Sequence, residues 1–70
     1  MSPKLTLFIN RDPYLREWRH KSATLLMVIT HMSENSICNI LEGNKTLKDI
    51  KNICDSEQVS YIEVRKILGI

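Results

Sequence analysis

The stretch that decides the fold spans residues 36–68 and reads SICNILEGNKTLKDIKNICDSEQVSYIEVRKIL. Its apolar residues recur at helical spacing in three short segments, which predicts three helices. The predicted helices cover residues 35–42, 47–54 and 60–68. The side chains expected to face a common core are Ile37, Ile40, Leu41, Leu47, Ile50, Ile53, Cys54, Val59, Val64, Ile67 and Leu68. The pattern therefore predicts a small tri-helical unit.

The ends of these helices carry local signals. Ser33 and Thr46 stand where helix N-caps are expected, and Asp49 completes a Thr-x-x-Asp capping pattern. Gly43 is expected to supply the left-handed residue after the first of these helices. The polar residues 55–58 are expected to form the turn before the last helix.

The preceding segment, residues 13–32, predicts one long helix. Asp12 is a good N-cap, and Pro13 suits the first helical position. Apolar residues recur with an approximate 3.6-residue period, and they define the face expected to be inward. They are Leu15, Trp18, Leu25, Ile29 and Met32. The competing interpretation is a strand over residues 24–30, because this stretch is rich in β-branched side chains.

Residues 5–9 read Leu-Thr-Leu-Phe-Ile, which predicts a short strand or an extended arm. The expected fold class is mostly α. The expected single domain covers residues 1–70, with an N-terminal arm or strand over 1–12, a long helix over 13–32 and the tri-helical unit over 34–70.

Composition limits the class of protein. The chain has 70 residues, a net charge of +2 and ordinary apolar and charged fractions of 43% and 26%. Cys38 and Cys54 are too few for a disulfide framework, so free thiols are expected. The longest apolar run, residues 25–29, is too short to cross a membrane, and no signal peptide is visible. We therefore expect a cytoplasmic protein with no membrane partner.

No catalytic or metal-binding pattern is present. His20, His31, Cys38 and Cys54 are zinc-ligand types, but they lack the close ligand pairs of structural zinc sites. Two glycines cannot supply a glycine-rich phosphate loop. The expectation is a protein that is not an enzyme and uses no metal or cofactor.

Residues 36–68 resemble a helix-turn-helix unit of the winged-helix kind. The matching positions are Ile50, Val59, Ser60, Val64, Arg65 and Leu68. The resemblance implies a small transcription regulator that binds double-stranded DNA, with the last helix in the major groove. In that geometry Ser60, Tyr61, Glu63, Arg65 and Lys66 would face base edges. Lys45, Lys48 and Lys51 would lie near phosphates.

The sequence departs from that pattern in three ways, one of which is that only Gly69 and Ile70 follow Leu68, so no wing is expected. Lys51 stands where a small residue usually packs between the helices. Asp55 stands where glycine usually makes the turn, and the turn is expected to be about three residues too long. The alternative function is a non-catalytic protein-interaction module, such as an inhibitor or adaptor, on the same scaffold.

A second resemblance concerns residues 33–68, which are similar to the helical part of PqqD-like peptide-recognition domains. Ile37, Ile40, Leu41, Glu42, Gly43, Thr46 and Ile50 match that pattern. This resemblance implies leader-peptide binding by strand addition, which requires strands at residues 5–9 and 24–30. Independently, a chain this small gains from burying part of the wide apolar stripe against a second copy, so a homodimer is expected; the stripe consists of Leu25, Leu26, Val28 and Ile29.

Overall fold

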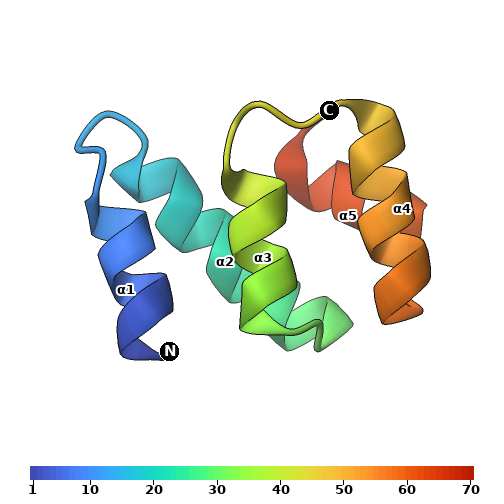
Figure 1. Cartoon of the computed structure of the whole chain (residues 1–70), viewed down its shortest axis with the longest axis horizontal. Helices are drawn as coiled ribbons and strands as arrows, with labels where there is room; N and C mark the ends of the chain where they lie inside the picture. The colour runs from blue at the N-terminus through green and yellow to red at the C-terminus, as the bar shows by residue number, and fades with distance from the viewer.

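Five helices and no strand make up the computed structural model, which describes residues 1–70 (Figure 1). They are α1 (Pro3–Asn10), α2 (Arg16–Thr30), α3 (Glu34–Leu41), α4 (Leu47–Glu57) and α5 (Tyr61–Leu68). The predicted mostly α class is confirmed.

Helix α1 replaces the strand or extended arm predicted at residues 5–9, so that prediction was wrong. Ser2 caps the helix by accepting the Leu5 N–H at 3.2 Å, and Pro3 occupies the first turn. Leu5, Phe8 and Ile9 are all buried, and their i, i+3, i+4 spacing places them on one helix face. The Ser-Pro start and this spacing outweigh the β-branched content of the segment.

Helix α2 confirms the helical interpretation of residues 24–30 over the strand, but it starts at Arg16 and ends at Thr30. The predicted start at Pro13 was wrong: residues 13–15 form a separate turn, in which the Leu15 N–H donates to the Asp12 carbonyl at 3.1 Å and the Tyr14 N–H to the Asp12 carboxylate at 3.0 Å. At the other end His31 adopts a left-handed conformation, φ 58°, and stops the helix before Met32.

The buried face of α2 also differs from the predicted one. Its buried residues are Arg19, Ser22, Ala23 and Leu26. Trp18 and Ile29, which were predicted to be inward, are exposed. The helix is thus turned so that a partly polar stripe faces the core, and the apolar side chains of Trp18 and Ile29 remain exposed to solvent.

Helices α3 and α4 begin at the predicted caps, and α5 begins at Tyr61 with Ser60, predicted to be its first residue, as the cap. Ser33, Thr46 and Ser60 each accept a backbone N–H three residues later. At α4 the capping box is complete, because the Asp49 carboxylate accepts the Thr46 N–H at 3.0 Å. Helix α4 continues to Glu57, so the predicted end at Cys54 and the predicted turn over 55–58 were wrong.

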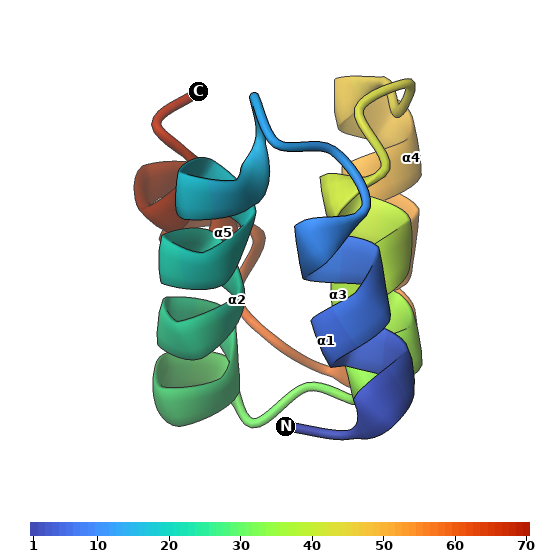
Figure 2. The same ribbon diagram turned by 90° about the vertical axis from the view of Figure 1, so that its left-hand side faces the viewer.

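The helices form two layers, with α2 and α5 in one and α1, α3 and α4 in the other (Figure 2). Helix α2 packs against α1, α3 and α5, whereas the backbones of α3 and α5 do not approach each other. The three C-terminal helices therefore do not close a core alone, because α2 completes it.

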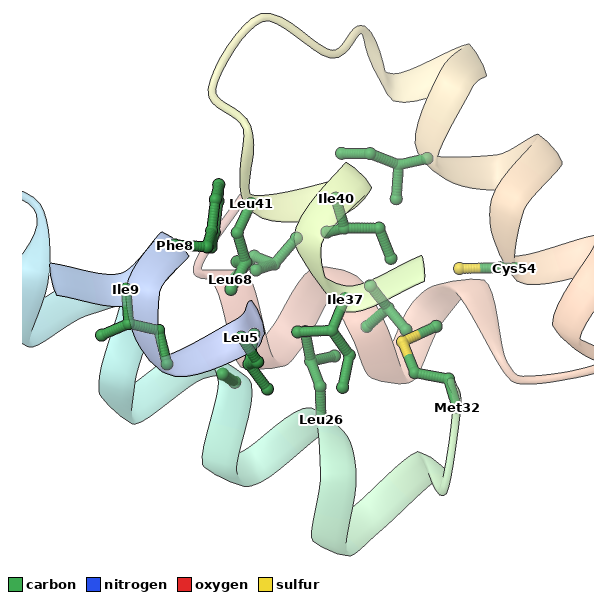
Figure 3. Close-up of a cluster of buried hydrophobic side chains, with 13 residues drawn as sticks. Leu5, Phe8, Ile9, Leu26, Met32, Ile37, Ile40, Leu41, Cys54 and Leu68 are labelled. Carbon is green, nitrogen blue, oxygen red and sulfur yellow. The ribbon is translucent and has the colours of Figure 1, made fainter. Parts of the chain in front are cut away.

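One core joins all five helices (Figure 3). Each helix contributes at least one side chain with no exposed surface: Leu5, Leu26, Ile37, Cys54 and Val64. Burial of these side chains supplies the main stabilisation of the fold.

Candidate nucleic-acid interface

The link between α4 and α5 has three residues, Gln58, Val59 and Ser60. Gln58 takes the left-handed conformation, φ 58°, and the Val59 N–H donates to the Cys54 carbonyl at 3.0 Å. The predicted excess of turn residues is thus absent, because α4 extends by three residues. A turn of this length is typical of helix-turn-helix units.

The additional residues of α4 make a tertiary contact with the start of α3. The Glu57 carboxylate accepts the Ser33 N–H, which ties the end of α4 to the start of α3. Because these residues are 24 positions apart, no local pattern in the sequence indicates this contact.

The solvent face of α5 carries Ile62, Glu63 and Lys66, all exposed. Ile62 was not among the predicted site residues. The spacing could have revealed its exposure, because Ile62 is not on the helix face formed by the buried residues Val64 and Leu68. This face combines one cation, one anion and one apolar side chain.

Three predicted site residues on α5 and its cap are engaged within the chain. The Ser60 hydroxyl accepts the Glu63 N–H at 3.2 Å. Tyr61 is half-buried against the core, and the Arg65 guanidinium carbon lies 5.6 Å from the Tyr61 ring centroid. The Arg65 Nε is buried and has no hydrogen-bond partner. Arg65 is therefore only partly available to a ligand.

Lys45, Lys48 and Lys51 are exposed at the start of α4 and in the loop before it. None forms an ion pair, because the one salt bridge of the chain joins Arg11 and Glu42 at 3.4 Å. The helix dipole adds positive potential at this end of α4. The Thr46 backbone N–H lowers the pKa of Asp49, and Lys45 and Lys48 lower it further.

The structure brings the predicted residues to the α4–α5 half of the molecule, since α4 packs on α5. Among them, Glu63 also lies next to residues of α2. It shares a shallow hollow with Ile29, Thr30, Gln58, Val59 and Ser60, between the end of α2 and the start of α5. The cationic members of the predicted site are therefore Lys45, Lys48, Lys51 and Lys66, with Arg65 partly covered.

The other polar features of the chain lie outside this region. A hollow between α1 and α3 contains Cys38 and is bridged by the Lys4–Asn35 hydrogen bond and the Arg11–Glu42 ion pair. Burial raises the pKa of the Cys38 and Cys54 thiols, which disfavours their reactive thiolate forms. No three His, Cys, Asp or Glu side chains gather as a metal site would require.

None of the five helices combines the length and apolar character that a membrane crossing needs. Comparison of the chain with protein families, with curated proteins and with solved structures finds no match.

Proposed function

We propose that the chain is a non-catalytic, DNA-binding regulator that contacts duplex DNA through α4 and α5. The observation that carries the proposal is the three-residue link at Gln58–Ser60, together with four exposed lysines without ion pairs on the two helices that it joins and in the loop before α4. This link allows two packed helices to present one helix to the major groove.

In this arrangement the lysines and α5 have different tasks. Lys45, Lys48 and Lys51 neutralise phosphates and fix the register on the duplex, with support from the dipole of α4. Lys66 is the cation of α5 best placed to reach a base edge, because it is exposed and unpaired. Arg65 contributes only if its guanidinium leaves the Tyr61 ring.

The test is fluorescence anisotropy of a mixed-sequence duplex of about 20 base pairs, titrated with the full chain at low and moderate salt. With the three phosphate contacts of Lys45, Lys48 and Lys51, the slope of log K against log salt is expected to be about −3. No binding at low salt would refute the proposal.

The location of the interface is tested with charge-matched variants. Lys51→Ala and Lys4→Ala each remove one positive charge from an exposed position, but Lys4 lies on α1. We expect Lys51→Ala to weaken binding severalfold and Lys4→Ala to change it little. Equal losses would show that the binding is not centred on α4 and α5.

A protein-interaction module is the second candidate. It is favoured by the apolar side chains that remain exposed on α1, α2 and α5, among them Leu7, Val28 and Ile62. Leader-peptide binding by strand addition is not proposed, because residues 5–9 and 24–30 are helical and provide no strand to extend.

A further inference from the structure

The outer side of α2 carries an apolar strip that no other helix covers. It consists of Trp18, Leu25, Val28 and Ile29, which are spaced to share one side of the helix. Trp18 is 39% exposed, Ile29 47% and Val28 67%, and Leu25 is half-buried. Apolar side chains gathered in this way commonly mark an interface.

The strip ends at the hollow between α2 and α5. Ile29 belongs to both, and Glu63 lines the hollow beside Ile29. Lys21 lies along the strip on α2, exposed like Glu63, and neither forms a salt bridge or a side-chain hydrogen bond. The strip therefore has an unpaired cation toward one end and an unpaired anion at the other.

We propose that this strip binds a second copy of the chain, with the two α2 helices antiparallel about a two-fold axis near Leu25. Trp18 and Ile29 are eleven residues apart, which is about 16 Å along a helix. In an antiparallel pair, Trp18 of each copy then reaches the region of Ile29 and the hollow on the other copy. The same patch serves both copies, as a two-fold interface requires.

Charge complementarity selects a second copy over other partners. With the axis near Leu25, Lys21 of one copy lies opposite Ile29 of the second copy, beside which stands Glu63 of the second copy. The symmetry repeats this pairing, so both cations meet anions. An acidic partner would satisfy Lys21 and repel Glu63, and a basic partner would do the reverse. This interface does not depend on DNA binding.

The first experiment is sedimentation equilibrium of the full chain over a wide concentration range at moderate salt. We expect a reversible monomer–dimer equilibrium. Val28→Glu places a charge in the strip without touching the core, and it should raise the dimer dissociation constant about tenfold or more. Leu7→Glu, at a position 73% exposed on α1, is the matched control and should leave it unchanged.

The second experiment tests the charge pairing. Lys21→Glu and Glu63→Lys are each expected to weaken the dimer about three- to tenfold, because each places like charges opposite one another. The double variant should return to within about twofold of the unmodified chain. Circular dichroism checks that every variant remains helical. A chain that stays monomeric, a dimer lost through Leu7→Glu instead of Val28→Glu, or a double variant without recovery would each overturn the proposal.

Discussion

Helices α3, α4 and α5 begin at hydroxyl caps that accept a backbone N–H three residues later, whereas α2 begins at Leu15 with no side-chain cap. What fixes α2 against α1 is a buried arginine. Arg19 is 3% exposed, and its guanidinium carbon lies 4.3 Å from the centroid of the Phe8 ring. Local hydrogen bonds thus define the starts of α3, α4 and α5, whereas a tertiary contact holds α2, which lacks a cap, against α1.

The Arg19 charge has no carboxylate partner, since it takes no part in a salt bridge. Its Nη1 donates instead to the Phe8 carbonyl at 3.2 Å, in the last turn of α1. A cation at a helix C-terminus interacts favourably with the helix dipole, and the aromatic ring adds a cation–π contact. The Nε has no partner, so part of the desolvation cost remains.

The largest effect is expected from Arg19→Ala, which removes the buried contact of Arg19 with Phe8 between α2 and α1. We expect a loss of about 3 kcal/mol in the free energy of unfolding, because the substitution leaves a cavity and removes the hydrogen bond and the ring contact. Arg19→Met fills the space and removes a desolvated charge, so its loss should be about 1 kcal/mol. Urea unfolding followed by circular dichroism gives both values.

Arg16→Ala is the control for this comparison. Arg16 is exposed and donates to the Asn10 side chain at 3.0 Å, so its removal should change stability by less than about 0.5 kcal/mol. An Arg19→Ala variant as stable as Arg16→Ala would show that the N-terminal pair does not depend on the buried arginine.

A smaller effect is expected at the α4 cap. Thr46→Ala removes the oxygen that accepts the Asp49 N–H at 3.1 Å, and we expect a loss of about 1 kcal/mol. Thr46→Ser keeps that oxygen and should stay close to the unmodified chain. Chemical denaturation of the three proteins side by side measures the difference. If Thr46→Ser were as unstable as Thr46→Ala, the methyl group and not the cap would account for the loss.

The same contrast explains how far the sequence predicts the structure. The starts of α3 and α4 are encoded within one turn, so Ser33, Thr46 and Asp49 reveal them. The burial of Arg19 depends on the Phe8 ring and carbonyl eleven residues away. The spacing of apolar residues along the sequence does not indicate that Arg19 is buried and Trp18 exposed. An overlooked local signal, Ser2–Pro3, would have revealed α1.

The candidate site divides in the same way. The exposure of Lys45, Lys48, Lys51 and Lys66 follows from the polar faces of their segments. The engagement of Arg65 with Tyr61 and the position of Glu63 beside Ile29 depend on how α5 packs on its neighbours. Residue type and spacing therefore predict which cationic side chains lie on polar faces, but packing decides which of them are available to a ligand.

The smallest expected effect is a decrease in stability at acid pH. Two carboxylates are compared: Glu34, which connects α3 to the cap of α1, and Asp49, which bonds within the first turn of α4. The Glu34 carboxylate at the start of α3 accepts the Ser2 N–H of the α1 cap at 2.9 Å, and this hydrogen bond lowers the pKa of Glu34. The Thr46 N–H likewise lowers the pKa of Asp49. Both carboxyl groups therefore bind protons more weakly in the folded chain than in the unfolded chain.

The unfolded chain consequently takes up more protons in acid, so stability rises with pH across this range. The contribution of both groups is fully present above the ordinary carboxyl pKa values and is lost as pH falls below about 4. We expect the urea midpoint to decrease between pH 6 and pH 3. Glu34→Gln and Asp49→Asn should each reduce that decrease, because each removes one of the shifted groups. Of the two variants, only Glu34→Gln should also increase amide exchange in α1, because Glu34, unlike Asp49, accepts a hydrogen bond from the cap of α1. If both variants retained the full pH dependence, other carboxylates would be responsible for the acid sensitivity.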